Sequence, residues 1–379
     1  MRLSTCWGGV AVGACMILSP GLAFPQRQSE WRTDFTRRTV PLEEIVSGGP
    51  PKDGIPAIDQ PKFESVADAD EWLSPREPVV LVVEGKDAKA YPLQILMWHE
   101  IVNDTVGGRP VAVTYCPLCN TALAFDRRVG ETMLDFGTTG RLRHSDLVMY
   151  DRQTESWWQQ ATGEAIVGEF AGRKLELVSA PLVNWLTFKS THPGGLVLSR
   201  STGFDRPYGE NPYARYDEPR GSPIANFFRG RPDSRLPAME RVTAVSLRGE
   251  DVAYSFRALR YSPVINDAVG GVPIAVFWTS GTVSALDNRQ IARGRDVGST
   301  GVFDRRHGDR ILDFEPAGTG RFRDRSTGSE FDLLGHAVSG PLEGTKLTAI
   351  PHGNHFWFAW GVFKPKTRIV DGRSETGTR

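Results

Sequence analysis

The chain repeats parts of its own sequence in the same order, and this feature constrains the fold more than any other. Three segments recur: IVNDTVGGRPVAV (101–113) as VINDAVGGVPIAV (264–276), FDRRVGETMLDF (125–136) as FDRRHGDRILDF (303–314), and DRQTES (151–156) as DRSTGS (324–329). Six further residues match at one fixed offset: Gly163, Gly168, Gly172, Leu175, Trp185 and Pro193 match Gly335, Gly340, Gly344, Leu347, Trp357 and Pro365. We therefore expect two related repeats in a pseudo-two-fold arrangement.

Within each repeat, most apolar runs are short and are separated by Gly, Asp or Asn, which is typical of strands joined by tight turns. The 40 glycines and 26 prolines of the chain favour many short strands over long helices. Helical spacing occurs in YPLQILMWHEIV (91–102) and in APLVNWLTFKSTHP (180–193). The sequence thus predicts a mainly β fold of the α+β kind, built as two β-rich repeats with short helices.

Composition divides the chain further. We expect a signal peptide (1–23), an N-terminal extension (24–60), a first repeat (61–198), a connecting segment (199–240), a second, degenerate repeat (241–370) and a tail (371–379). The connecting segment is rich in Gly, Pro, Arg and Asp with little periodicity, which is more typical of an ordered wrap or linker than of a site.

The first 23 residues combine a basic residue, an apolar stretch and the small residues Gly21 to Ala23, as a secretory signal does. Cleavage after Ala23 would place the mature protein in the periplasm or outside the cell. A lipoprotein signal ending at Cys15 is the alternative. No later stretch holds the roughly 18 apolar residues of a membrane-spanning helix, so we expect no membrane span.

The charges of the chain exclude some partners. Lys and Arg total 45 and Asp and Glu total 45, and no long run of one sign occurs. A nucleic acid or an anionic membrane surface is therefore not expected as a partner. The sequence does not indicate an oligomeric state, nor whether the protein is an enzyme.

Removal of the signal would leave two cysteines, Cys116 and Cys119, in VTYCPLCNTALAF (113–125). A disulfide across so small a loop restrains the unfolded chain little, so a purely stabilising bridge is the weakest interpretation. A thioredoxin-like motif would precede a helix, whereas the residues after Cys119 form a short apolar run with few helix signals. Strand, CPLC, strand is instead the pattern of a zinc-knuckle hairpin, which supplies two of about four ligands.

The remaining ligands should come from histidines, and three of them lie in suggestive contexts. His99 ends the first predicted helix, where capping of the helix C-terminus is the alternative role. His352 and His355 lie in PHGNHFWFAW, whose spacing would put both rings on one face of a helix that continues through Trp357 and Trp360. Two polar caps at a helix start are the alternative there.

The duplication favours a composite site. The second repeat has no cysteines after its IAV strand and has Ser262 in place of His99. The first repeat has Ala180 and Val183 in place of His352 and His355. Each half has what the other lacks, as one site at the interface of two related repeats would, although divergence without function gives the same pattern.

Four motifs, HEIVND (99–104), TYCPLC (114–119), LVMYDR (147–152) and HGNHFWFAW (352–360), make the chain resemble the DUF3179 family of bacterial and archaeal proteins of unknown function. The resemblance spans roughly residues 60 to 370. It implies export in many members and no established chemistry. The segment GRLRHSD (140–146) departs from the pattern, where an asparagine is expected near His144.

Three functions follow as hypotheses. The first is a copper or zinc site formed by His99, Cys116, Cys119, His352 and His355, served by a metal donor or redox partner outside the cytoplasm. The second is a thiol-disulfide oxidoreductase that uses the cysteine pair directly. The third is a non-catalytic ligand-binding module with an aromatic groove, formed by Trp157, Trp158, Trp185, Phe356, Trp357, Phe358 and Trp360.

Overall fold

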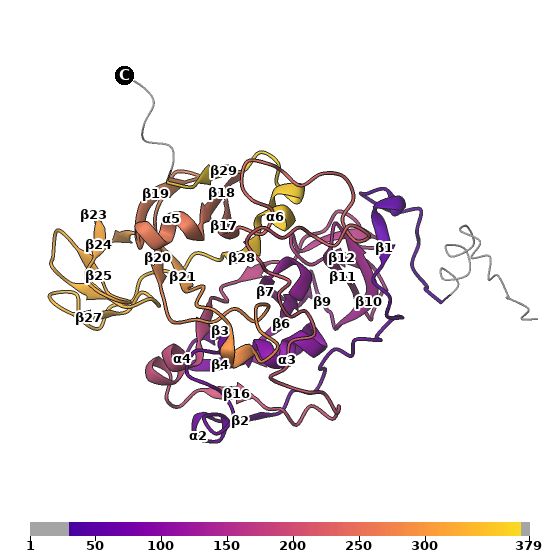
Figure 1. Cartoon of the computed structure of the whole chain (residues 1–379), viewed down its shortest axis with the longest axis horizontal. Coiled ribbons are helices and arrows are strands. Elements are labelled where there is room, and N and C mark those ends of the chain that lie inside the picture. Colours follow the sequence, from indigo (N-terminus) through magenta and orange to yellow (C-terminus); the bar gives the residue numbers. More distant parts are fainter. Residues whose placement is uncertain (1–29, 373–379) are drawn as a thin grey trace, which may run out of the picture.

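The computed structural model describes residues 30–372, which form a mainly β protein with few, short helices, as predicted (Figure 1). The predicted signal peptide (1–23) lies outside the described residues. So does most of the tail, beyond residue 372. Within the described part, no helix is both long enough and apolar enough to cross a membrane.

The first half begins with a 3-10 turn, two short strands and a short helix, and its main strands follow. Its elements are η1 (Leu42–Glu44), β1 (Ile45–Ser47), β2 (Phe63–Ser65), α2 (Val66–Ala69), β3 (Pro78–Glu84), β4 (Asp87–Pro92), α3 (Leu93–His99), β5 (Ile101–Val106), β6 (Arg109–Cys116), η2 (Pro117–Cys119), β7 (Thr121–Asp126), β8 (Arg128–Val129), β9 (Thr132–Met133), β10 (Phe136–Arg143), β11 (Asp146–Asp151), β12 (Trp157–Gln159), β13 (Glu164–Val167), β14 (Leu177–Val178), β15 (Leu182–Asn184), α4 (Trp185–Thr191) and β16 (Leu196–Leu198).

The second half follows after the connecting segment. Its elements are β17 (Arg241–Leu247), β18 (Glu250–Ser255), α5 (Phe256–Tyr261), β19 (Val264–Val269), β20 (Val272–Thr279), η3 (Ile291–Arg293), β21 (Ser299–Asp304), β22 (Arg306–His307), β23 (Arg310–Ile311), β24 (Phe314–Pro316), β25 (Phe322–Asp324), β26 (Glu330–Phe331), β27 (Ala337–Ser339), β28 (Gly353–Phe356), α6 (Trp357–Phe363) and β29 (Arg368–Val370).

Strand pairing follows the same scheme in the two halves. Strand β15 pairs antiparallel with β3 and β16 pairs parallel with β4. In the same way, β28 pairs antiparallel with β17 and β29 pairs parallel with β18. The order of elements from β3 to β16 therefore parallels the order from β17 to β29. The pseudo-two-fold axis and the domain boundaries stay predictions.

The largest sheet is shared between the halves. Its strands run in the order β29-β18-β17-β28-β7-β6-β5, with β14 also pairing with β7. Strand β28 is the link, because it pairs with β17 on one side and with β7 on the other, through Asn354 opposite Ala122. The HGNH segment thus lies beside the strand that follows CPLC, more than 200 residues earlier in the chain (Figure 1).

The helix predicted from His352 onward is wrong in its first turn. Residues Gly353–Phe356 form strand β28, and helix α6 begins only at Trp357. Side chains alternate between the two faces of a strand, so residues three apart point to opposite sides. His352 precedes this strand, so the helical face expected to carry both His352 and His355 does not form.

The connecting segment (199–240) has no helix or strand among the described residues, yet it is well packed. Tyr208, Tyr213, Tyr216 and Phe227 contact the largest apolar core cluster, and Phe228 belongs to that cluster. The backbone N–H of Ser145 donates to the carbonyl of Phe227 over 2.7 Å. The segment therefore wraps over the first half, on the side where the CPLC turn lies.

The aromatic residues proposed for a ligand groove lie in the core. All seven are at most 7% exposed: Trp157, Trp158, Trp185, Phe356, Trp357, Phe358 and Trp360. They belong to four different apolar clusters. Tryptophan and phenylalanine at such burial stabilise the fold and present no common face to a ligand.

Candidate metal centre

The CPLC turn is a tight hairpin, as the sequence predicts. Strand β6 ends at Cys116, one turn of 3-10 helix spans Pro117–Cys119, and β7 begins at Thr121, which pairs with Cys116. Pro117 suits the first position of this turn because its φ is already fixed near the helical value. Asn120 closes the turn in the left-handed conformation at φ 50°, which asparagine tolerates better than most residues.

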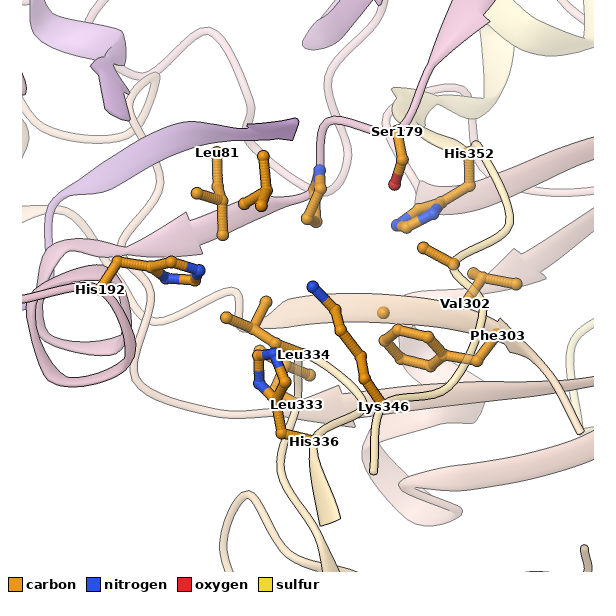
Figure 2. Close-up of a pocket in the computed structure, with 14 residues that line it drawn as sticks. Leu81, Ser179, His192, Val302, Phe303, Leu333, Leu334, His336, Lys346 and His352 are labelled. Atoms are coloured by element: carbon orange, nitrogen blue, oxygen red, sulfur yellow. The ribbon is translucent and has the colours of Figure 1, made fainter. Parts of the chain in front are cut away.

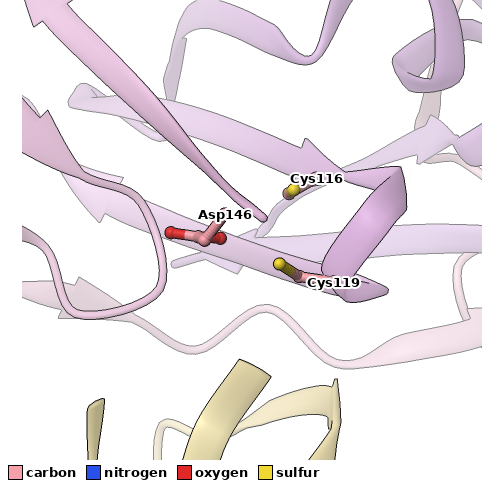
Figure 3. Close-up of side chains that lie close together, drawn as sticks. All are labelled: Cys116, Cys119 and Asp146. Carbon is pink, nitrogen blue, oxygen red and sulfur yellow. The ribbon is translucent and has the colours of Figure 1, made fainter. Parts of the chain in front are cut away.

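The turn brings the two sulfurs together with a carboxylate that sequence reasoning did not select. Sγ of Cys116, Sγ of Cys119 and a carboxylate oxygen of Asp146 all lie within 4.8 Å of one another (Figure 3). In the described part of the chain, this is the one group of three or more His, Cys, Asp or Glu side chains close enough to share an ion. Both cysteines are free thiols, and all three residues are buried.

Asp146 is held by the hairpin between β10 and β11. It is the first residue of β11 and follows His144 and Ser145, which both have positive φ (51° and 67°). Its Oδ2 accepts hydrogen bonds from Gln159 Nε2 (2.5 Å) and the Ala161 amide (2.9 Å). Its Oδ1 is buried with no hydrogen-bond partner among the described residues. One oxygen therefore fixes the carboxylate and the other is left for a further contact.

Burial shifts the pKa of each of the three groups upward. Burial raises the pKa of Asp146 to about 6, against the opposing effect of hydrogen bonds from the Ala161 amide, Gln159 and the Cys119 thiol. Burial raises the pKa of Cys116, and that of Cys119 still further because the Cys116 thiol and Asp146 lie beside it. Charged forms of all three groups are thus costly here unless a cation accompanies them.

A second buried acid, Glu100, lies close to this group. Burial raises its pKa to about 8, and the negative charge of Asp146 adds to the shift. Its backbone has φ 58°, in the left-handed region where a residue with a side chain is strained. Glu100 also lines a cavity of about 140 Å³ together with Leu118 and Tyr213.

Other polar atoms around the turn lack partners as well. Asn120 Nδ2, Ser145 Oγ and Tyr115 Oη are buried without a hydrogen bond inside the described range. Buried polar groups are nearly always hydrogen-bonded in native proteins, and those that are not call for an explanation such as a bound ion or water. Strained residues and unpartnered atoms together make this region the candidate functional site.

His99 does not join the sulfurs. It is buried at the end of α3, as predicted. Its Nδ1 hydrogen bonds to the carbonyl of Pro56 (2.7 Å) and its Nε2 to Tyr208 Oη (2.6 Å). Both ring nitrogens are therefore engaged, and His99 anchors the connecting segment to the first half.

His352 and His355 both lie outside the cysteine group and line different cavities. His355 is buried, and its Nδ1 hydrogen bonds to Thr121 Oγ1 over 2.9 Å, which brings it to the strand after the turn but not into the cluster. Burial lowers the pKa of His355 to about 3, so it is neutral. His352 faces a separate cavity and hydrogen bonds through Nδ1 to the carbonyl of Ile350 (2.9 Å).

Sequence reasoning thus found the two cysteines but missed Asp146 and Glu100. Glu100 lies next to His99 in the HEIVND motif, and Asp146 lies in GRLRHSD, just before LVMYDR. The available signal was that Glu100 lies inside one family motif and Asp146 directly before another. Neither acid was selected, because residue type alone does not distinguish a buried acid from the many surface carboxylates of the chain.

Comparison with known proteins adds the family but no activity. The model of the family described as "Protein of unknown function (DUF3179)" matches residues 52–367. No curated protein and no solved structure matches the chain. All four motifs and the cysteine group fall within the matched range. The chain belongs to the DUF3179 family.

Proposed function

We propose that this protein binds a transition metal ion, zinc or copper, through Cys116, Cys119 and Asp146. The observation that carries the proposal is the grouping of two thiols and a carboxylate oxygen within 4.8 Å in the protein interior. The proposal keeps both cysteines of the sequence prediction. It uses Asp146 where histidines were expected.

Charge supports a cation at this place. Cys116, Cys119, Asp146 and Glu100 are all buried, and each is neutral only when protonated. The positive charge of Arg143 lowers the pKa of Asp146, but Arg143 is itself paired with Glu44 at 2.7 Å. A divalent ion would neutralise the thiolates and the carboxylate together, since metal binding displaces their protons.

The donor set favours zinc over copper. Two thiolates and one carboxylate oxygen are common zinc ligands, and three protein ligands leave the fourth tetrahedral position for water or another group. Copper(I) prefers soft sulfur and would make little use of Asp146. Of the two metals, zinc therefore accounts better for the unpartnered Oδ1 of Asp146.

Thiol-disulfide exchange has less support. Cys116 and Cys119 are 1% and 0% exposed, so a partner thiol cannot reach either sulfur in this conformation. Exchange also needs a thiolate, and burial raises the pKa of both thiols.

The site on the exported chain would be loaded outside the cytoplasm. This location follows from the predicted signal peptide and is part of the proposal. A metal donor, or a redox partner if the ion is copper, would then be the natural partner class.

Metal content tests the proposal. Protein purified from the periplasm should hold about one equivalent of zinc or copper by elemental analysis. The double variant Cys116→Ser, Cys119→Ser should hold none. Asp146→Asn should weaken the affinity about tenfold or more, since a neutral amide is a poorer ligand than a carboxylate.

Two histidine variants serve as matched controls. His99→Gln and His355→Gln should keep the metal, because both rings are hydrogen-bonded elsewhere. Equal metal content in the wild type and the double cysteine variant would refute the proposal. Loss of metal in either histidine variant, with Asp146→Asn unaffected, would return the site to the histidine ligands expected from the sequence.

A further inference from the structure

A second cavity lies between the two halves, away from the cysteine group, and is lined by basic and apolar side chains (Figure 2). The first half contributes Leu81, Val83, Ser179, Pro181 and His192, and the second half contributes the other lining residues. Its volume is about 90 Å³, several times the roughly 10–15 Å³ that one water molecule requires. It is therefore large enough for a small organic molecule.

The charged and titratable groups at this cavity are all basic, and the Ser179 hydroxyl also lines it. Lys346, His192, His336 and His352 line it together, and no Asp or Glu does. Figure 2 shows the Lys346 amine directed into the space between His192 and Ser179. Among the described residues, the Lys346 amine has no hydrogen-bond or ion-pair partner, whereas His336 is paired with Asp332 at 3.2 Å. The cavity thus offers one uncompensated positive charge to an anion.

His352 adds a different requirement. It is 5% exposed, and its Nε2 is buried with no hydrogen-bond partner in the described part. Its Nδ1 lies 2.9 Å from the carbonyl of Ile350, so Nδ1 carries the proton and donates it. Nε2 of the neutral ring is then an acceptor, which an O–H or N–H group of a ligand would satisfy.

The remaining walls are apolar. Leu81, Val302, Phe303, Leu333 and Leu334 line the cavity. A ligand here would meet a cation, a hydrogen-bond acceptor and a hydrocarbon wall.

From this arrangement we propose that the cavity between the halves binds a small hydroxycarboxylate, with its carboxylate at Lys346, its hydroxyl donating to Nε2 of His352, and a short aliphatic part against the apolar wall. The site is independent of the metal centre, which lies elsewhere in the fold and shares none of its lining residues.

Three probes of four carbons separate the components of the proposed recognition. Binding of 2-hydroxybutyrate, butyrate and 1,2-butanediol to the full chain would be measured by isothermal titration calorimetry. We expect 2-hydroxybutyrate to bind tightest. Butyrate should bind about tenfold more weakly, because it leaves Nε2 of His352 unpaired. Butanediol, which lacks the carboxylate, should show no saturable binding.

Variants assign these differences to residues. Lys346→Met should abolish the preference for carboxylates, and His352→Leu should reduce 2-hydroxybutyrate to the affinity of butyrate. The matched control is Lys174→Met. The backbone of Lys174 forms an isolated β-bridge with Glu164 in the first half, as the backbone of Lys346 does with His336 in the second, but Lys174 does not line this cavity. Lys346 is exposed, so its variant should fold even if His352→Leu does not.

The proposal fails if none of the three probes binds the wild type at millimolar concentration. It fails equally if butanediol binds as well as 2-hydroxybutyrate, or if Lys174→Met weakens binding as much as Lys346→Met does. A normal hydroxyl preference in a folded His352→Leu variant would overturn the role given to Nε2.

Discussion

Two buried carboxylates in this protein, those of Asp217 and Asp146, have pKa values shifted in opposite directions. Asp217, in the connecting segment, is 1% exposed and paired with Arg241 (2.6 Å) and Arg295 (2.8 Å). Burial alone would raise its pKa, but the two guanidiniums and the hydroxyl of Ser284 hold the pKa below the usual value. Asp146 is equally buried, yet burial wins and raises its pKa to about 6.

The difference shows what the fold supplies and what it leaves to a ligand. At Asp217 the chain brings arginines from two other segments to neutralise one carboxylate. At Asp146 it brings two thiols and a second acid, Glu100, but no comparable cation. A buried charge is tolerated only when it is paired, protonated or bound to a metal. This difference supports the proposal that an ion from outside binds at the cysteine group.

The largest effect should come from breaking the compensated pair. Arg241→Met would leave Asp217 buried with one arginine in place of two. We expect the free energy of unfolding to fall by about 3 kcal/mol, since removing one partner of a buried ion pair leaves a charge uncompensated. Urea denaturation measures this. Arg257→Met is the control, because Arg257 lines a cavity together with Asp217 and Arg241 but is exposed. An equal loss in both variants would show that Asp217 does not depend on Arg241.

The stability of metal-free protein should depend on pH through Glu100, the buried acid beside the cysteine group. The pKa of Glu100 is raised from 4.5 to about 8, so its contribution to stability is complete below about pH 4.5 and is lost as the pH rises through about 8. In metal-free protein, Glu100→Gln should therefore be more stable than the wild type at pH 8.5, by roughly 2–3 kcal/mol.

The two proteins should converge toward pH 5, and urea denaturation at both values measures the difference. Glu131→Gln, at an exposed glutamate, is the control and should show no such pH dependence. If wild type and Glu100→Gln differ by the same amount at pH 5 and at pH 8.5, Glu100 does not ionise in the folded state as described.

The smallest effect concerns strain at the turn that presents Asp146. Ser145 has φ 67° and a buried hydroxyl with no partner among the described residues. Ser145→Gly should stabilise metal-free protein by about 1 kcal/mol, because glycine accepts this φ and removes the unpaired hydroxyl. Arg248→Gly relieves a similar φ of 49° at an exposed turn and should have a smaller effect. A destabilised Ser145→Gly variant would show that this hydroxyl already has a stabilising role without metal.

The local features of the site were predictable from the sequence, whereas its long-range contacts were not. The CPLC hairpin follows from two short apolar runs around a proline turn, and α3 follows from its helical spacing. The strand at Gly353–Phe356 was missed because its form depends on pairing with β17 and β7. A segment of four residues is too short to carry a period that could reveal such pairing.

Asp146, the third residue of the cysteine group, was missed for the same reason. Asp146 lies beside the cysteines because it begins β11, directly after the turn of the β10–β11 hairpin. Only the folded backbone shows that Gln159 and the Ala161 amide hold one of its oxygens and leave the other free.

The coordination shell of the loaded protein tests the central claim most directly. X-ray absorption at the edge of the bound metal, recorded on the wild type, should show two sulfurs at about 2.3 Å and at least one oxygen near about 2.0 Å if the ion is zinc. Asp146→Asn should keep the sulfurs and change the oxygen shell. A shell of nitrogen and oxygen alone, with no sulfur, would contradict a metal centre at Cys116, Cys119 and Asp146.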